Sequence, residues 1–254
     1  MVVVSFKNKF IFIKRSINAS TSIEEFLSQF AMDPHNYSPY IKTDEDESNW
    51  FKKYHNFGIN IDDYGLVVKN RKEENDPKIT NKLSNKMDIK KNTNFKKCYN
   101  HMSYESLSEM INLRDYIIVS TIRNPWDRTV SIFYKDMYRN CIDIDNPIIQ
   151  FTSWILNKKN RPDDMFEKIL DKNKKPICDI YIRFEHIYND IKIFLIKYLK
   201  KTNIEAETLL ENLPEFKIHV RKDKNNYKKY YNNVTKNIVK EWYKKEILLG
   251  NYTF

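Results

Sequence analysis

The chain has few of the features that mark disulfide-rich, secreted or membrane-spanning proteins. Its three cysteines, Cys98, Cys141 and Cys178, are scattered, with no CxxC pair and no Cys/His spacing typical of zinc sites. They are expected to be reduced thiols, and no metal site is expected. The opening stretch is interrupted by Lys7 and Lys9 and has no small-residue cleavage site, so it is unlike a signal peptide or a membrane span. A cytoplasmic location is the resulting expectation.

Glycine is also scarce, with three residues in the chain, and neither GxxxxGK[ST] nor GxGxxG is present. Their absence argues against an ordinary kinase and against a Rossmann dinucleotide-binding protein. No internal repeat and no long Gly/Ser or Pro linker divides the sequence. With 41% hydrophobic residues the chain can bury a substantial core, and we expect a single domain over residues 1–254.

Positive charge is in excess, because 44 Lys and Arg residues outnumber 34 Asp and Glu residues and give a formal net charge of +10. Such a surface attracts anions, which include phosphates, sulfated sugars and nucleic acid. The interleaved Tyr and Lys residues of "NNYKKYYNN" (225–233) keep a nucleic-acid-binding module open as an alternative. That alternative predicts oligonucleotide binding that weakens strongly with salt.

Three segments combine a short apolar strand with a following amphipathic helix. The expected strands are residues 10–13, 116–122 and 178–184. The apolar stripes of the expected helices cover residues 23–30, 130–137 and 191–199. This alternation predicts an α/β fold of three layers, with a central, mainly parallel sheet and helices on both faces.

Other local patterns refine this picture. Thr21 with Glu24 is a capping-box pattern that places a helix start near Thr21, and Pro125 marks the start of the second helix. A final helix is expected over residues 234–249. Residues 35–97 are polar and weakly patterned, which is typical of a disordered insertion or a functional lid.

The loop after the first expected strand, "KRSINASTS" (14–22), is suited to binding an anion. A strand that feeds a helix N-terminus presents free backbone N–H groups and the positive end of a helix dipole. Side-chain donors and positive charge are supplied by Lys14, Arg15, Asn18, Ser20, Thr21 and Ser22. An ordinary βα turn with good capping remains the alternative for this loop.

A second turn, "TIRNPWDRTVSIFY" (121–134), follows the second expected strand. Arg123 leaves the strand, and Ser131 lies eight residues later in the first turns of the next helix, so both side chains can face one phosphate. Trp126 is expected to pack this motif against the core. Two anion-binding turns on one sheet indicate a nucleotide with phosphates at two positions.

These turns resemble those of the carbohydrate-type sulfotransferases that use 3′-phosphoadenosine 5′-phosphosulfate (PAPS). "IFIKRSINASTSIEEFL" (11–27) is similar to the family's 5′-phosphosulfate loop, and "IRNPWDRTVSIFY" (122–134) to its 3′-phosphate motif. "YIRFEHIYNDI" (181–191) and "RKDKNNYKKYYNN" (221–233) are similar to later family segments. The resemblance implies a P-loop-like sulfotransferase fold and transfer of a sulfuryl group from PAPS to a hydroxyl, with a carbohydrate as expected acceptor and 3′,5′-diphosphoadenosine as product. No stable nucleic-acid partner is then expected.

The resemblance also assigns roles to the residues that match. Residues 18–22 would wrap the 5′-phosphosulfate, Arg123 and Ser131 would hold the 3′-phosphate with support from Arg128, and a segment near residue 221 would cover the cofactor. The residues implied to bind the cofactor are Asn18, Ala19, Ser20, Thr21, Ser22, Arg123, Arg128, Ser131, Arg221 and Lys222.

One position departs from the family pattern. Ile17 stands where the family has a lysine whose ammonium stabilises charge on the bridging oxygen during transfer. Loss of one preorganised donor costs about 10²- to 10³-fold in rate. Lys14 and Arg15 are the candidates that replace this charge in catalysis. The second interpretation is a pseudoenzyme that binds PAPS without turnover.

Transfer to a hydroxyl also needs a base, and histidine is suited to this at neutral pH. We favour His101, because it lies just upstream of the second strand, where some related sulfotransferases carry a histidine. A structural role is the alternative for each histidine of the chain. The other histidines are His35, His55, His186 and His219.

Overall fold

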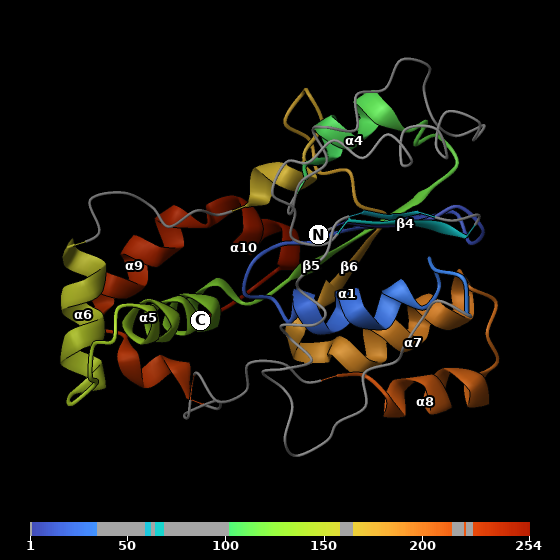
Figure 1. Cartoon of the computed structure of the whole chain (residues 1–254). Coiled ribbons are helices and arrows are strands. Elements are labelled where there is room, and N and C mark those ends of the chain that lie inside the picture. Colours follow the sequence, from blue (N-terminus) through green and yellow to red (C-terminus); the bar gives the residue numbers. More distant parts are fainter. Residues whose placement is uncertain are drawn as a thin grey trace.

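The computed structural model describes residues 2–34, 59–61, 64–68, 102–157, 165–214, 221 and 226–254. Within these residues the chain folds into a six-stranded mixed sheet flanked by helices (Figure 1). The strands are β1 (Val2–Ser5), β2 (Phe10–Ile13), β3 (Ile59–Ile61), β4 (Gly65–Val68), β5 (Ile117–Ile122) and β6 (Ile180–Arg183). The α-helices are α1 (Ser20–Ser28), α4 (Tyr104–Met110), α5 (Pro125–Arg139), α6 (Pro147–Asn157), α7 (Ile187–Lys197), α8 (Asn203–Glu211), α9 (Asn233–Trp242) and α10 (Lys244–Gly250). Short 3-10 helices are η2 (Phe166–Ile169), η3 (Phe184–His186) and η4 (Tyr227–Tyr230).

The order of strands in the sheet is β3-β4-β1-β2-β5-β6. β2, β5 and β6 are parallel neighbours, whereas β1 is antiparallel to both β2 and β4, and β3 is antiparallel to β4. Among the described strands β2, β4, β5 and β6 therefore run in one direction, and β1 and β3 run in the other. The predicted α/β class is confirmed, and the antiparallel half at the β1 side was not foreseen.

Two apolar cores cover the two faces of the sheet, because successive residues of a strand point to opposite faces. Ile11 and Ile13 of β2 belong to the core that also contains α4 and η2. Phe10 and Phe12 belong to the core formed with α1, α7 and α8. Figure 1 shows α4 above the sheet and α1 and α7 below it. This arrangement confirms the predicted helices on both faces.

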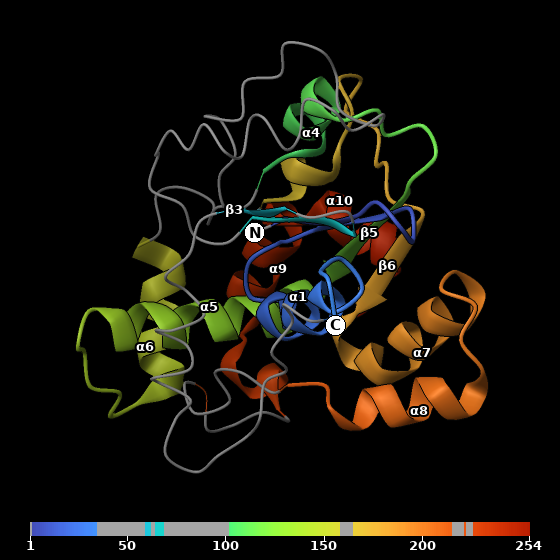
Figure 2. The same ribbon diagram turned by 45° about the vertical axis from the view of Figure 1, so that its right-hand side comes forward.

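A third core is formed by α5, α6, η4 and α9, which make a helical group at one end of the sheet (Figures 1 and 2). The rings of Phe133 on α5 and Phe151 on α6 meet edge to face, with centroids 5.5 Å apart. The hydroxyls of Tyr134 and Tyr230 are 2.8 Å apart. Trp126 is buried in this core, as its sequence context predicts. These contacts fix α5, so that its N-terminus stays at the end of β5.

Several local predictions are confirmed. β2, β5 and β6 lie within the three predicted strand segments, and α1, α5 and α7 follow them. Pro125 is the first residue of α5. Cys141 and Cys178 are free, whereas Cys98 lies outside the described residues. No helix in the described part of the chain is both long enough and apolar enough to cross a bilayer.

Two local predictions are wrong, and one of two alternatives for a third segment is excluded at a few residues. The predicted 234–249 helix is two helices, α9 and α10, that are divided at Tyr243. Residues 59–61 and 64–68 contain strands β3 and β4, so disorder, one of the two alternatives predicted for residues 35–97, does not apply to these two strands. The capping box at Thr21 is absent: α1 has Ala19 as its N-cap, and the Glu24 carboxylate instead binds Lys14.

Gly65 begins β4, opposite Ser5 of β1, at a position with no room for a side chain. A Cβ atom at this position would lie 2.2 Å from the carbonyl oxygen of Val4 and 2.7 Å from that of Ala31. Both atoms belong to the backbone and cannot move independently, so Gly65→Ala is expected to lower the free energy of unfolding by about 2–3 kcal/mol. Urea unfolding measures the change. The matched control is Gly250→Ala, because the three atoms nearest to its added Cβ belong to the Tyr252 side chain and not to the backbone; an equal loss in both variants would contradict the prediction.

Candidate anion-binding site at the carboxyl ends of β2 and β5

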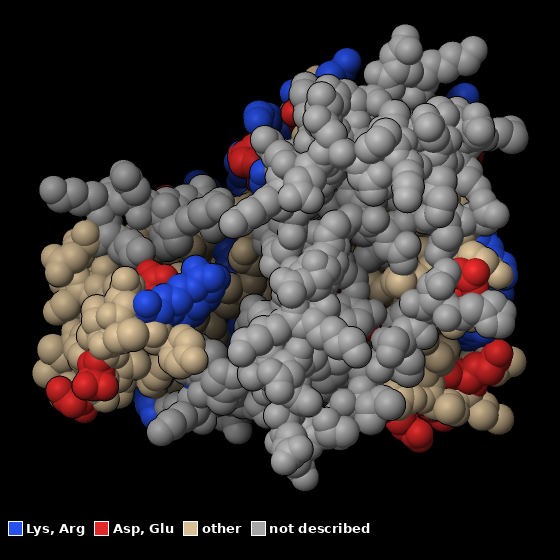
Figure 3. Space-filling model, in the orientation of Figure 1, with Lys and Arg blue, Asp and Glu red and all other residues tan. Residues whose placement is uncertain are grey.

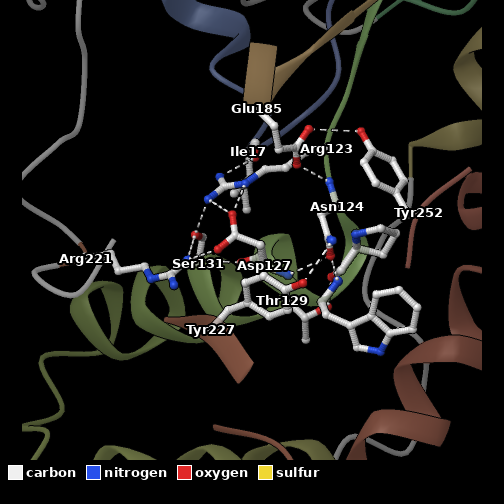
Figure 4. A network of polar contacts seen from close by, with 12 residues as sticks. Ile17, Arg123, Asn124, Asp127, Thr129, Ser131, Glu185, Arg221, Tyr227 and Tyr252 are labelled. Atoms are coloured by element: carbon white, nitrogen blue, oxygen red, sulfur yellow. Dashed lines mark hydrogen bonds and ion pairs between the residues drawn. The ribbon is translucent and has the colours of Figure 1, made fainter. Parts of the chain in front are cut away.

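The two predicted anion-binding turns meet at one edge of the sheet. β2 and β5 are parallel neighbours with Ile13 opposite Ser120, so the turns that follow them leave the sheet side by side. In open α/β sheets ligands bind at the carboxyl ends of the strands. Arg123 links the turns directly, because its Nη1 donates a hydrogen bond to the carbonyl oxygen of Ile17 at 3.1 Å (Figure 4).

Asp127 lies between two arginines from distant parts of the chain. Its Oδ2 is 2.6 Å from Nη2 of Arg123, and its Oδ1 is 2.6 Å from Nη1 of Arg221. All three side chains are almost completely buried. Figure 4 shows the two guanidinium groups converging on Asp127 and Ser131. The carboxylate therefore holds the two like charges near one point.

Ser131 accepts hydrogen bonds from both arginines. Its Oγ is 2.9 Å from Nη2 of Arg123 and 3.1 Å from Nη1 of Arg221. A hydroxyl has two acceptor lone pairs and one hydrogen, so both lone pairs are engaged and the hydrogen is left to donate. Among the described residues no acceptor takes that hydrogen. The predicted proximity of Arg123 and Ser131 is confirmed, and the serine is oriented as a donor between two cations.

The environment of Arg123 strengthens its attraction for an anion. Burial lowers the pKa of its guanidinium; Asp127 opposes this effect, and the charge of Arg221 adds to it. The guanidinium carbon lies 3.8 Å from the centre of the Phe184 ring, in the segment after β6. Desolvated charge interacts more strongly with a nearby anion than charge in water does.

The backbone N–H groups at the N-terminus of α5 find hydrogen-bond acceptors within the protein. The side-chain oxygen of Asn124 accepts hydrogen bonds from the backbone N–H groups of Trp126 at 3.0 Å and Asp127 at 3.3 Å. The Asn124 N–H itself donates to Glu185 at 2.6 Å. Asn124 Nδ2 donates to the Tyr227 hydroxyl at 3.2 Å. The second turn therefore offers side chains, not backbone groups, to a ligand.

The N-terminus of α1 has the opposite character. Its N-cap, Ala19, has a φ of 52° and no side chain that can cap the helix. In the described part of the chain nothing accepts a hydrogen bond from the N–H groups of Ser20 and Thr21. Such groups, with the positive end of the helix dipole, favour an anion. The first turn therefore offers backbone donors.

The first turn is strained and firmly anchored. Ile17 has a φ of 63°, a left-handed conformation that is unfavourable for a β-branched residue. The Ser20 hydroxyl donates to the carbonyl oxygen of Arg15, and it lies 3.0 Å from the hydroxyl oxygen of Thr121. Asn18 Nδ2 donates to the carbonyl oxygen of Thr121 at 3.3 Å. The side chains of Asn18 and Ser20 thus hold the loop on β5, instead of supplying the free donors that the sequence predicts.

Lys14 and Arg15 are engaged in ion pairs. Lys14 Nζ is 2.7 Å from a carboxylate oxygen of Glu24. Arg15 is fully buried and pairs with Glu246 at 2.9 Å. Arg128, predicted to support the phosphate motif, pairs with the same glutamate at 2.7 Å. All three predicted cations are therefore paired with carboxylates.

A further positive side chain lies one turn beyond Ser131 on α5. Burial lowers the pKa of the Lys135 ammonium, Arg139 and Lys14 add to the effect, and Asp136 opposes it. Lys14 and Lys135 therefore lie within electrostatic range of each other. On the face in Figure 3 a group of Lys and Arg side chains lies over α5. Positive side chains of α5 and of the first turn therefore lie near one another.

Some predicted residues cannot be placed. His101 and Lys222 lie outside the described residues, as do His35, His55 and His219. His186 is exposed in η3. Thr21 is half-buried and Ser22 is buried at the start of α1. Among the described residues no cluster of acidic, histidine or cysteine side chains could hold a metal ion.

Sequence reasoning missed three residues of the site: Asn124, Asp127 and Glu185. The spacing of Arg123 and Asp127 was an available indication, since opposite charges four residues apart often pair at a helix start. Glu185 lies in the "YIRFEHIYNDI" segment that resembles the family, but its hydrogen bond to the Asn124 backbone depends on the pairing of β5 with β6.

Comparisons of the chain with protein families, with curated proteins and with solved structures find no match. The residues and their geometry are therefore the basis for assigning a function.

Removal of the Asp127 carboxylate should leave two buried arginines without their shared partner. Asp127→Ala is expected to lower the free energy of unfolding by about 3 kcal/mol, as for other broken buried ion pairs. Urea unfolding measures this, and Asp145→Ala, which removes an exposed aspartate after α5, is the control. Equal stability of the two variants would show that Asp127 does not hold the arginines together.

Proposed function

We propose that the protein is a PAPS-dependent sulfotransferase with the P-loop-like fold of that class, and that it transfers the sulfuryl group to a hydroxyl of a carbohydrate. The observation that carries the proposal is the Ser131 hydroxyl, oriented as a donor between Arg123 and Arg221, in a turn that Arg123 joins to the first turn with its available backbone N–H groups. A nucleotide with phosphates at two positions needs two such sites on one edge of a sheet.

The residues present fit this cofactor in charge and in donor type. Arg123, Arg221 and Asp127 together carry one net positive charge, and with Ser131 they would hold the 3′-phosphate. The N–H groups of Ser20 and Thr21 would hold the 5′-phosphosulfate, as helix N-termini do for phosphate groups. PAPS supplies an activated sulfuryl group on a phosphosulfate bond.

The chain's own residues would then position the donor and move a proton. Arg123 joins the two turns through the Ile17 carbonyl, so both phosphate groups would be bound by connected parts of the chain. His101 is the proposed base for the acceptor hydroxyl, because imidazole accepts a proton at neutral pH.

A second candidate function is nucleotide binding without turnover. It is favoured by the partners of the two charges nearest to Ile17, since Lys14 pairs with Glu24 and Arg15 pairs with Glu246. Ile17 supplies no charge itself. In this arrangement the turns could bind the nucleotide, while the two cations nearest to Ile17 are already paired with carboxylates.

Calorimetric titration with 3′,5′-diphosphoadenosine tests the binding site. The native protein is expected to bind it, and Ser131→Ala to bind about 10- to 100-fold more weakly, since a hydrogen bond to a charged group contributes about 1.5–3 kcal/mol. The control is Ser153→Ala, an exposed serine on α6. Absence of binding to the native protein would refute the proposed function, and oligonucleotide binding that survives Arg123→Ala would favour a nucleic-acid-binding module instead.

Ile17→Lys separates the two candidate functions. We expect it to raise the rate of PAPS cleavage by about 10²- to 10³-fold, because it places an ammonium on the strained turn. Ile17→Met, which has a similar length and no charge, is the matched control. Release of 3′,5′-diphosphoadenosine with water as the acceptor measures the rate without knowledge of the natural acceptor. Rapid cleavage by the native protein would exclude the binding-only function.

A further inference from the structure

Three charged side chains from distant parts of the sequence meet inside the protein. Glu246 on α10 pairs through Oε1 with Nη1 of Arg15 at 2.9 Å and through Oε2 with Nη1 of Arg128 at 2.7 Å. The exposed fractions of the side chains of Arg15 and Glu246 are 0%, and that of Arg128 is 4%. The cluster is therefore a buried triad with one net positive charge.

Each carboxylate oxygen of Glu246 pairs with an arginine from a different turn of the candidate site. Arg15 belongs to the first turn, and its Nη1 also donates to the Thr121 carbonyl at 3.0 Å, which ties that turn to the end of β5. Arg128 belongs to α5, next to Asp127 and one turn before Ser131. A single carboxylate thus connects the backbone-donor turn with the side-chain-donor turn.

Stability alone does not explain this triad. Well-packed apolar side chains of similar volume are often as stable as a buried ion pair or more so, because burial of charge costs solvation free energy. Ion pairs differ from apolar contacts in that they fix distance and direction. Burial alone would raise the pKa of the Glu246 carboxyl, but Arg128 and Arg15 outweigh burial and lower it, so the carboxylate stays ionised and bridges both partners.

The surroundings of the triad hold each arginine in one direction. The Arg128 guanidinium carbon lies 4.5 Å from the centre of the Tyr243 ring, and that of Arg15 lies 5.4 Å from the centre of the Phe166 ring. Neither arginine can swing toward solvent without leaving a buried carboxylate behind. A displacement of α10 would therefore move both turns.

We propose that Glu246 is a positioning residue that sets the spacing of the two anion-binding turns, and with it the preference for nucleotides that carry two phosphates over those that carry one. The proposal rests on the proposed function for the identity of the ligand. Two phosphates on one rigid molecule bind with a gain in effective concentration only if both sites are correctly spaced. A monophosphate contacts one site and is insensitive to that spacing.

Titration of Glu246→Gln with three nucleotides tests the proposal. We expect affinity for 3′,5′-diphosphoadenosine to fall about tenfold, and affinities for adenosine 3′-monophosphate and adenosine 5′-monophosphate to change less than about threefold. The matched control is Glu241→Gln, which changes an exposed glutamate on α9 and should alter none of the three. A uniform loss for all three nucleotides, or no loss for the bisphosphate, would overturn the proposal.

A second variant covers the case in which Glu246→Gln does not fold. The triple variant Arg15→Met/Arg128→Met/Glu246→Met removes all three charges at similar volume and should fold. It is expected to show the same selective loss of bisphosphate affinity. Native preference for the bisphosphate in this variant would show that packing, and not the carboxylate bridge, sets the spacing.

Hydrogen exchange separates failure of this proposal from failure of the proposed function. If the native protein binds none of the three nucleotides, the proposed function fails, and the positioning role is decided by backbone exchange rates alone. Relative to Glu241→Gln, both Glu246→Gln and the triple variant should exchange faster at residues 16–22 and 124–128, with α8 unchanged. Unchanged rates in either turn would overturn the positioning role.

Discussion

The site depends on the hydrogen bonds and the ion pair made by the guanidinium group of Arg123. It donates to the Ile17 carbonyl in one turn and to the Ser131 hydroxyl in the other, and it is paired with Asp127. Without the aspartate, Arg123 and Arg221 would repel each other in a poorly solvated space. The negative charge of Asp127 therefore offsets the repulsion between the two arginines, and both can donate hydrogen bonds to Ser131.

The two turns differ because their helix caps differ. Asn124 satisfies the first N–H groups of α5 with its side chain, whereas Ala19 cannot do this for α1. As a result one turn recognises anions through the backbone and the other through side chains. Backbone donors tolerate changes of side chain, so substitution should affect the second turn more than the first.

Much of the fold could be predicted from short-range patterns. The apolar runs of β2 and β5 and the helical stripes of α1, α5 and α7 are local features, and the spacing of Arg123 and Ser131 follows from the start of α5 at Pro125. β3 and β4 were not predicted, because they are defined by long-range pairing, β4 with β1 and β3 with β4, which a local sequence pattern does not show.

The ion-pair partners of the charged side chains were the main feature that the sequence did not predict. Lys14 and Arg15 were expected at the ligand because they are close to it in sequence, but Arg15 and Arg128 both pair with Glu246 at the far end of the chain. Sequence shows which charges exist, and only the assembled fold shows which of them neutralise one another. Asp127 was visible in the motif, yet its link to Arg221 required the same long-range information.

The sequence separation of these contacts has a consequence for the order of folding. The hydrogen bond from Arg123 to Ile17 joins residues 106 positions apart, and that from Arg15 to Glu246 joins residues 231 positions apart. Contacts of long sequence separation form late, because the chain entropy of closing the loop is lost before they stabilise the structure. The carboxylate that joins Arg15 and Arg128 belongs to α10, so during synthesis the two turns are expected to be held together only after α10 has emerged from the ribosome.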